Sequence, residues 1–347
     1  MPKLNPKLFV DEEFELYPDR HVHRQRGAKP KSQPRRLPAV DAETLAIQED
    51  GARNFTFSYH ASRHERQWIL DSLGGFYEGQ WVSDVLRQVK GGKEASVYQC
   101  ASGVMANREE TIAAKVYRPR QFRNLKNDHL YREGRTVLDA DGNQVLDHGM
   151  IHAMHKRTTY GLQVLHASWI EHEYQALVDL HAAGADVPEP YARGDNAVLM
   201  SFIGEAETPA PTLNSVELDP LEAHTLFHRV LRNIEIMLSH GHIHADLSAF
   251  NILYWDGKIT LIDFPQVIHP DQNRNAFRIF ERDVIRVCEY FTRQGLRVGP
   301  SKLAADLWTA NHYRLAPEVH PSLLDDQNDA DRAYWQSLSE YSSEKRR

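Results

Sequence analysis

Two aspartates and one asparagine in the second half of the sequence have the spacing that a phosphoryl-transfer centre needs. Asp246 and Asn251 lie in the segment His244-Ala245-Asp246-Leu247-Ser248-Ala249-Phe250-Asn251, and Asp263 follows in Ile262-Asp263-Phe264-Pro265. Transfer of phosphate from ATP requires one carboxylate that orients the attacking hydroxyl, and an Asn with a second Asp that hold magnesium on the phosphates. The segment supplies this set of groups.

A lysine inside an apolar β-like run supplies a positive charge for the same centre. Lys115 lies within 113–116, where an ammonium group is costly to bury unless a carboxylate pairs with it. Glu171 and Glu173 are the two candidate partners in a helical segment further along the chain. Inward-facing helical residues recur at a spacing of four, and Glu173 is followed at that spacing by Leu177, whereas Glu171 is followed by a polar residue. The spacing favours Glu173; the alternative is a surface lysine with an unrelated helical Glu.

A turn with glycines precedes the lysine run, at the place where a turn that covers phosphates belongs. It reads Gly91-Gly92-Lys93-Glu94-Ala95-Ser96-Val97-Tyr98. Gly92 lets the backbone approach a phosphate, and Lys93 and Ser96 can donate hydrogen bonds to it. Only one glycine of a G-x-G-x-x-G loop is present, so an ordinary hairpin turn is the alternative.

The hydrophobic patterns around these residues predict a small β-rich lobe and a mostly helical lobe. The predicted strands are 81–89, 95–100, 111–117 and a crossing strand at 197–200. The predicted helices are 64–73, 169–183, 221–239, 276–293 and 301–312, and residues 251–262 predict a hairpin around Trp255-Asp256-Gly257. The expected fold class is α+β, with a cleft between the lobes.

Composition excludes several classes of protein. The 347 residues carry a formal net charge of -7, and no run of 18 apolar residues could span a membrane. Cys100 and Cys288 cannot build a disulfide framework, and the N-terminus lacks the layout of a secretory signal. We therefore expect a cytoplasmic protein without a membrane partner.

The first residues of the chain differ in character from the rest. Residues 20–36 contain seven Lys/Arg and no Asp/Glu, which is typical of a segment that does not fold by itself. Such a tail could contact an RNA or ribosome-associated partner, or remain solvated. The expected regions are a largely disordered tail at 1–55, a helical lead-in at 56–80, an N-lobe at 81–203 with a mobile insertion at 118–168, a C-lobe at 204–315 and a C-terminal extension at 316–347.

Taken together, the motifs resemble the RIO family of atypical serine/threonine protein kinases, in its bacterial type. The resemblance covers about residues 65–300 and rests on G-K-E-A-S-V-Y (92–98), A-K-V-Y (114–117), W-x-E-x-E (169–173), V-P-E-P (187–190), L-M-S-F-I-G (199–204), P-A-P (209–211), H-A-D-L-S-x-F-N (244–251) and I-D-F-P-Q (262–266). It implies a trimmed bilobal protein-kinase-like fold, with a β-rich N-lobe and a mainly helical C-lobe.

The resemblance also implies a role for each site residue. Asp246 would be the catalytic base, Lys115 would contact phosphate, and Asn251 and Asp263 would bind Mg²⁺, for which Mn²⁺ could substitute. Met200 would be the gatekeeper beside the adenine. The ATP-binding set that we expect is Gly92, Lys93, Glu94, Ala95, Ser96, Val97, Lys115, Glu173, Met200, and the backbone of Ser201 and Ile203; the catalytic set is Asp246, Lys115 and Asp263.

The implied function is ATP- and Mg²⁺-dependent phosphoryl transfer to serine or threonine of an unidentified protein, autophosphorylation included. Some members of the family resemble ATPase switches that pass phosphate through an aspartate, which would be Asp263 here. Members in eukaryotes and archaea assist ribosome maturation. No winged-helix segment is recognisable before Gly91, so the resemblance implies a ribosomal role only weakly.

Three other functions compete with this interpretation. Aminoglycoside and choline phosphotransferases also use a His-x-Asp with an Asn five residues on, but the turn at 92–98 and the crossing strand favour the RIO interpretation. A kinase-like protein that serves only as a scaffold would be expected to lack a catalytic group, and none is missing here. The run 242–246 imitates the start of a zinc-hydrolase motif whose last His is replaced by Leu247. Against zinc, we expect His244 to orient the loop through a backbone carbonyl. Separately, we expect Asp283 to be a buried structural carboxylate that caps the loop backbone and does not catalyse.

Overall fold

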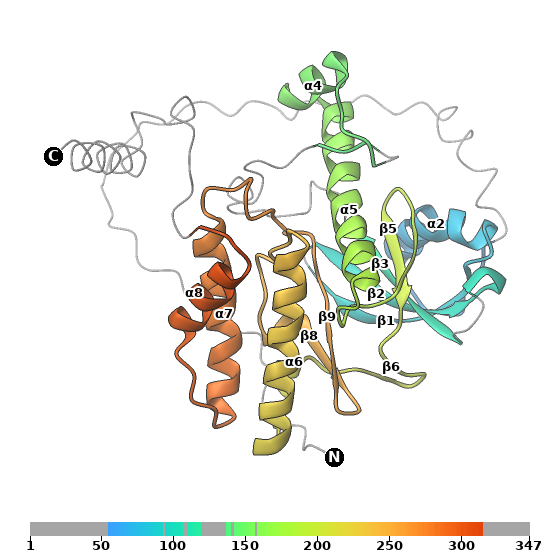
Figure 1. Ribbon diagram of the computed structural model, residues 1–347. Coiled ribbons are helices and arrows are strands. Elements are labelled where there is room, and N and C mark those ends of the chain that lie inside the picture. Colours follow the sequence, from blue (N-terminus) through green and yellow to red (C-terminus); the bar gives the residue numbers. More distant parts are fainter. Residues whose placement is uncertain are drawn as a thin grey trace, which may run out of the picture.

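The computed structural model describes residues 55–92, 94–106, 110–118, 137–139, 142–156 and 158–314. A five-stranded sheet forms one lobe and a group of helices forms most of the other (Figure 1). This confirms the expected α+β class. Of the predicted tail at 1–55, all but residue 55 lies outside the described residues, and so does the predicted extension at 316–347.

The sheet places Lys115 at its centre. Its strands are β1 (Val82–Gly91), β2 (Ala95–Ser102), β3 (Thr111–Tyr117), β4 (Pro190–Arg193) and β5 (Ala197–Ser201). They are antiparallel, in the order β1-β2-β3-β5-β4. On the middle strand β3, Lys115 faces Val97 of β2 and Val198 of β5. A side chain there is fixed by neighbours on both sides.

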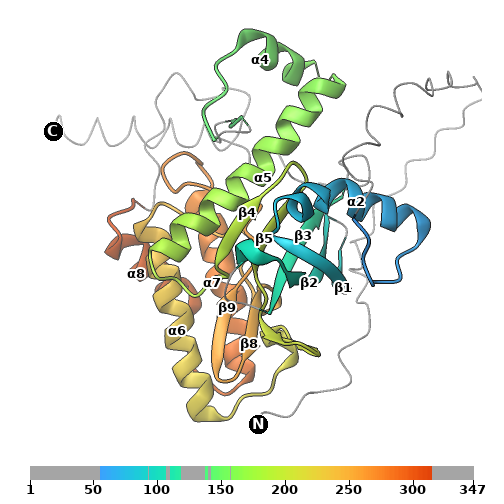
Figure 2. The same cartoon turned by 90° about the vertical axis from the view of Figure 1, so that its right-hand side faces the viewer.

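Helix α2 (Arg63–Glu78) packs against the N-lobe sheet (Figure 2). Ser62 begins it by accepting a hydrogen bond from the Glu65 N–H. The sequence predicted an end at residue 73, before two glycines, but the helix continues for five more residues. Each helical glycine costs about 1 kcal/mol relative to alanine. Burial of Phe76 on the following turn offsets that cost.

Helix α5 (Thr159–Ala182) begins ten residues before the predicted start at 169 and so enters the region 118–168 that we assigned to an insertion. Its first turns pack against α4 (His148–His155), and both project from the body of the molecule (Figures 1 and 2). A Cβ added at Gly161 would lie 2.1 Å from the Ala153 carbonyl oxygen, so this close packing requires glycine. Mobility of the insertion stays a prediction, because residues 119–136 lie outside the described part.

The lower half of α5 belongs to both lobes. Trp169 and Ile170 pack with Tyr117 of β3, whereas Leu177 and Leu180 lie in the C-lobe core. The Trp169 and Tyr117 rings meet edge to face at 5.0 Å between centroids. Glu173 lies on the helix between the residues that pack on the N-lobe and those that pack in the C-lobe core. Contacts with both lobes therefore hold its position.

The C-lobe is built from helices and a hairpin around one apolar core. Its main elements are α6 (Pro220–Ser239), β8 (Ile252–Trp255), β9 (Lys258–Leu261), α7 (Ala276–Arg293) and α8 (Pro300–Ala310). Short pieces complete the fold: β6 (Gly204–Glu205), β7 (Thr208–Pro209), and the 3₁₀ turns η1 (Val104–Ala106), η3 (Leu213–Ser215) and η4 (Ala249–Asn251). None of the described helices has both the length and the apolar character that a membrane crossing needs.

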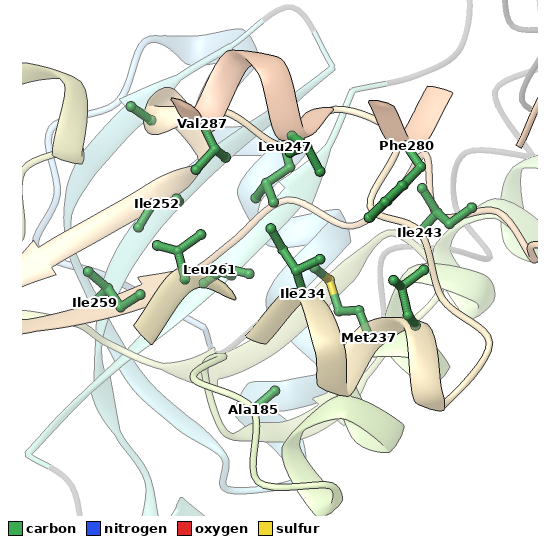
Figure 3. Close-up of a cluster of buried hydrophobic side chains, with 14 of the residues drawn as sticks. Ala185, Ile234, Met237, Ile243, Leu247, Ile252, Ile259, Leu261, Phe280 and Val287 are labelled. Carbon is green, nitrogen blue, oxygen red and sulfur yellow. The ribbon is translucent and has the colours of Figure 1, made fainter. Parts of the chain in front are cut away.

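Leu247 anchors the segment between α6 and β8 in this core. Its side chain lies among apolar residues of α6 and α7, including Ile234, Phe280 and Val287 (Figure 3). The neighbouring Asp246 is exposed, so the segment buries one side chain and presents the next to solvent. Burial of Leu247 therefore fixes the position of the neighbouring Asp246 at the surface of the core.

The chain enters the N-lobe through residues that the sequence assigned to the tail or its border. Phe55 and Phe57 are buried, and the Phe55 ring stacks on Tyr77 of α2 with 4.6 Å between centroids. The Tyr59 N–H donates to the Val85 carbonyl of β1 at 3.0 Å. Phe55 therefore belongs to the folded lobe, because its ring completes a core that α2 and the sheet leave open.

Two N-terminal truncations should separate the tail from the fold. A chain that starts at residue 55 should keep the melting temperature of the full chain, because it retains both phenylalanine rings. A chain that starts at residue 59 should lose several kcal/mol of unfolding free energy, since deleting one buried Phe side chain costs about 3–5 kcal/mol. Calorimetry of the two truncations tests this. Equal melting temperatures would show that the rings contribute nothing to the fold.

Candidate active site

The centre of the site is a buried lysine held between two carboxylates. The Lys115 Nζ lies 2.5 Å from the Glu173 Oε1 and 2.5 Å from the Asp263 Oδ1. The other oxygen of Glu173 accepts a hydrogen bond from the Tyr117 hydroxyl at 2.5 Å. Both oxygens of Glu173 thus have donors, and the partner chosen from the helical spacing is confirmed.

Glu171, the competing partner, points elsewhere. It is buried, it forms an ion pair with the Arg193 guanidinium of β4, and it accepts a hydrogen bond from Gln175 at 2.9 Å. The sequence argument treated this face of α5 as polar and outward. It missed the ion pair because β4 packs on α5, which no spacing within the helix could show.

The ion pairs set the charge of the groups they join. Burial acts to lower the pKa of Lys115, but the carboxylates of Asp263 and Glu173 outweigh burial and raise it. Burial likewise acts to raise the pKa of Asp263, and the Lys115 ammonium outweighs it and lowers the pKa. Lys115 and Asp263 are therefore both charged at neutral pH.

The two aspartates that the sequence predicts to be catalytic lie in segments whose backbone is strained. Asp263 has φ 75° and Ala245, directly before Asp246, has φ 65°. Side chains rarely adopt this left-handed region, so other contacts must hold it. His244 supplies one: its Nε2 lies 3.0 Å from the Ile262 carbonyl oxygen, which joins the two segments. This is the backbone contact that the sequence analysis expected of His244.

Asp246 and Asn251 meet as their five-residue spacing predicts. The Asn251 Nδ2 donates to the Asp246 carbonyl oxygen at 2.9 Å and lies 3.3 Å from its Oδ2. Because the nitrogen of the amide faces Asp246, the amide oxygen of Asn251 is left to serve as a ligand. Mg²⁺ takes oxygen ligands, so Asn251 and Asp263 fit the metal roles expected of them.

Helix α7 supports the Asp246 segment from below. Arg282 donates to the Ala245 carbonyl oxygen, and the Leu247 N–H donates to the carboxyl group of Asp283. The structure thus agrees with the capping role expected of Asp283. Further along α7, the Arg286 Nη1 donates to the Asp246 Oδ1 at 2.9 Å. The sequence analysis missed Arg282 and Arg286, because an arginine on an amphipathic helix is usually solvated.

These groups surround one cleft between the lobes with a volume of about 1640 Å³. Lys115, Glu173, Asp246 and Asp263 all line it. Its apolar lining comes from both lobes and includes Val97, Ala113, Leu253 and Ile262. Apolar walls with a few polar groups at one end suit a ligand that has a flat ring and a charged tail.

The turn between β1 and β2 forms part of the cleft, with one exception to the expected set. Gly92, Glu94, Ala95 and Val97 line the cleft, and a Cβ added at Gly92 would lie 2.9 Å from the Ala95 carbonyl oxygen. Ser96 is fully buried and does not line it. The Ser96 side chain is therefore not placed where it was expected, since successive strand residues point to opposite faces of a sheet. Lys93 lies outside the described residues.

The end of β5 and the residues that follow it form another part of the cleft lining. Met200, Ser201 and Ile203 all line it, as expected for an adenine-binding segment. The Ser201 N–H donates to the Glu189 carbonyl and the Ile203 carbonyl accepts from Ala210, both at 2.9 Å. Since the Ile203 carbonyl is already used, its N–H is the backbone group of that residue that could meet an adenine edge.

The histidines of the competing zinc motif are engaged in other contacts. His244 is buried, which lowers its pKa and keeps it neutral, and it bonds the backbone as described. The His242 Nε2 lies 3.6 Å from an oxygen of Asp179, and His240 ends α6. In the described part of the chain, no three His, Cys, Asp or Glu side chains converge on a point where a metal could sit. The geometry therefore gives the zinc interpretation no support.

Residues 96–303 match the model of the RIO domain, and they make up more than half of the chain. The chain belongs to the RIO domain family. All the catalytic residues expected from the sequence fall inside this RIO domain.

Three protein kinases of the family show how far the similarity reaches. Serine/threonine-protein kinase RIO1 of Homo sapiens is 33% identical over 132 residues, which is 38% of this chain and 23% of that protein. RIO-type kinase Rio1 of Thermoplasma acidophilum is 32% identical over 135 residues, 39% of this chain and 69% of that protein. Rio1 of Haloferax volcanii is 30% identical over 210 residues, 59% and 62% of the two chains. The matched part of this chain thus spans about a quarter of the length of the human protein.

A solved structure has the same fold. It is the Rio2 kinase–ADP/Mg²⁺–phosphoaspartate complex from Chaetomium thermophilum, which matches with a TM-score of 0.50 and 17% identity over 88% of this chain and 86% of that one. The likeness shows that this RIO domain has the bilobal fold of that kinase.

Neutralising the two glutamates of α5 should have different effects. Glu173→Gln should lower phosphoryl transfer by about tenfold or more, because Lys115 loses the partner that positions it. Glu171→Gln should leave transfer nearly unchanged and cost about 2 kcal/mol of stability, since it weakens a buried charged contact. Transfer rates measured below both melting temperatures, with thermal unfolding alongside, test the pair. Equal losses of transfer would contradict the assignment of Glu173.

Asp283 should make stability depend on pH. Burial raises its pKa to about 7 in the folded protein, above the value of about 3.9 in an unfolded chain. As pH rises, the unfolded chain therefore releases this proton first, and Asp283 lowers stability progressively between about pH 4 and pH 7. Asp283→Asn cannot ionise, so its melting temperature should rise relative to wild type across this interval and level off above it. Glu289→Gln, an exposed change on α7, is the control; a flat difference for Asp283→Asn would contradict the shift.

Proposed function

We propose that this RIO domain transfers the γ-phosphate of ATP, in the presence of Mg²⁺, to a serine or threonine hydroxyl of a protein. The observation that carries the proposal is the convergence of Lys115, Glu173, Asp263 and Asp246 on one cleft. Asn251 is hydrogen-bonded to Asp246 beside it. Membership of the RIO domain family and the kinase activity named for its relatives support it.

The cleft suits ATP in one orientation. Adenine would lie between the apolar residues of the two lobes, with its edge at the Ser201 and Ile203 backbone. The phosphates would then extend toward Lys115 and the turn at Gly92. In this position Lys115 neutralises phosphate charge without moving a proton, because its pKa is raised and it stays an ammonium group.

Magnesium would bind between Asn251, Asp263 and the phosphates. Two protein oxygens are few, but Mg²⁺ is commonly held by one or two protein groups, with phosphate oxygens and water completing the octahedron. The Asp263 side chain is 42% exposed, so an ion can reach it from the cleft. The Rio2 kinase structure holds ADP and Mg²⁺, which supports Mg²⁺ as the metal, and Mn²⁺ could replace it.

Asp246 would handle the acceptor. Its side chain is 53% exposed at the cleft, so a hydroxyl group of a second molecule can approach it. The carboxylate would orient this hydroxyl and accept its proton during transfer. Since every group of the set is in place, a scaffold without catalysis has no structural support. The kinases among the relatives act, by name, on serine and threonine, which disfavours a small-molecule acceptor.

A second candidate is an ATPase cycle in which Asp263 receives the phosphate. The phosphoaspartate in the Rio2 kinase complex favours it, and so does the exposure of Asp263 to the cleft. Four further parts of this proposal rest on the sequence alone, for the kinase and for the ATPase cycle. They are an unidentified acceptor protein, autophosphorylation, a cytoplasmic location, and an RNA- or ribosome-associated partner of residues 1–55.

The two aspartates should fail in different ways when each is replaced by asparagine. Asp246→Asn keeps the metal groups, so MgATP should bind with similar affinity while transfer falls by about 10²–10⁴-fold. Asp263→Asn removes a metal ligand, so nucleotide binding should weaken and lose magnesium dependence. Asparagine also tolerates the left-handed backbone at this position, so the fold should persist. Titration of MgATP binding and single-turnover transfer to a generic protein acceptor measure both effects.

The same pair of variants separates the two candidate functions. Protein acceptors labelled on serine or threonine by wild type, but not by Asp246→Asn, support the kinase. A hydroxylamine-sensitive phosphate on wild type that disappears in Asp263→Asn supports the ATPase cycle. Near-normal transfer by Asp246→Asn would show that the catalytic role of this loop is wrong.

A further inference from the structure

Arg286 contacts the carboxylate that the proposed function assigns to the acceptor. It lies on α7, 40 residues after Asp246, and its Nη1 donates to the Asp246 Oδ1 at 2.9 Å. The contact is on the surface of the cleft region, with 40% of the Arg286 side chain and 53% of the Asp246 side chain exposed. An exposed ion pair of this kind contributes little to folding, so its role is unlike that of the buried pairs.

The rest of the loop fixes the backbone of Asp246 but leaves its carboxylate loosely held. Leu247 is buried in the C-lobe core, and Arg282 and Asn251 bond the carbonyl oxygens of Ala245 and Asp246. The side chain itself has a donor at 3.3 Å, from Asn251, and a donor at 2.9 Å, from Arg286. The shorter, charge-assisted bond is the stronger one. Arg286 therefore decides which way the carboxylate faces.

Charge gives Arg286 a second effect on the same group. Asp246 shares the cleft with Asp263 and Glu173, and a bound triphosphate would add further negative charge. Like charges repel the carboxylate from the position where it must meet an acceptor hydroxyl. A guanidinium on the side of α7 opposes this repulsion, while the planar group holds the carboxylate in one orientation.

From these contacts we propose that Arg286 is a positioning residue for phosphoryl transfer, which acts through Asp246. It binds one oxygen of the carboxylate and so presents the other to the acceptor hydroxyl. The inference rests on the proposed function, since it concerns the step that Asp246 would perform. It assigns to α7 the orientation of the Asp246 carboxylate, beyond its support of the loop backbone.

Replacement of Arg286 should slow transfer without weakening nucleotide binding. Arg286→Ala should lower kcat by about tenfold, since loss of orientation at a reacting group has effects of this size or larger. The KM for MgATP should stay within about twofold, because no group that meets the nucleotide changes. Arg286→Lys should retain an intermediate rate, and guanidinium ions added to Arg286→Ala should restore part of it. Arg278→Ala, an exposed arginine on the same helix, is the matched control and should behave as wild type with an unchanged melting temperature.

A double-mutant cycle with Asp246 decides whether the effect passes through that residue. If it does, Arg286→Ala combined with Asp246→Asn should transfer no more slowly than Asp246→Asn alone. Multiplied losses, a raised KM for MgATP, or a lowered melting temperature of Arg286→Ala would each overturn the proposal. Absence of transfer by wild type would instead count against the proposed function. In that case the contact itself is tested by arginine side-chain NMR: the Arg286 guanidinium should rotate slowly in wild type and freely in Asp246→Asn, and free rotation in wild type would refute it.

Discussion

A buried ammonium group determines much of this structure. Lys115 is on the central strand of the sheet, where a cation is tolerated only with partners within hydrogen-bond distance. One partner, Glu173, comes from the helix shared by the two lobes, and the other, Asp263, comes from the segment after β9 in the C-lobe. A single side chain thus joins three parts of the chain. The mutual position of the lobes is coupled to the charge state of the centre, because separating them would leave a buried charge without a partner.

The same contact explains how the site can be assembled before a nucleotide arrives. Asp263 is on a strained backbone, and its pairing with Lys115 compensates for that strain. Lys115 contacts one of the two carboxylate oxygens of Asp263, and the side chain is partly exposed, so Asp263 could also hold Mg²⁺ from the cleft side. Lys115 would keep Glu173 as its partner while it met a phosphate, which avoids the cost of an unpaired buried ion.

The sequence predicted contacts of the site correctly where residues close in the chain form a regular pattern and a charged group requires a partner. Glu173 could be chosen over Glu171 because helical spacing placed it above a buried leucine, and the spacing of Asp246 and Asn251 is short enough for one loop to join them. Contacts between distant segments left no such pattern. Arg193 with Glu171, and Arg286 with Asp246, are pairs brought together only by packing of β4 on α5 and of α7 under the loop. Ser96 shows a third limit: a hydrogen-bonding residue in a glycine turn can still point to the buried face of the strand that follows.

The two aspartates of the proposed centre are paired with cations of different kinds, and the difference follows from the role proposed for each. Asp263 would hold a metal that is present in every cycle, so its partner is a buried lysine whose compact charge can move to phosphate. Asp246 would meet an acceptor that binds and leaves in each cycle. Its carboxylate therefore needs a fixed direction in an open part of the cleft. A planar guanidinium on α7 gives that direction without closing the site, since the contact is half exposed. The division of charges between β3 and α7 therefore lets one carboxylate serve the nucleotide side and the other the acceptor side, each held by a different lobe of the protein.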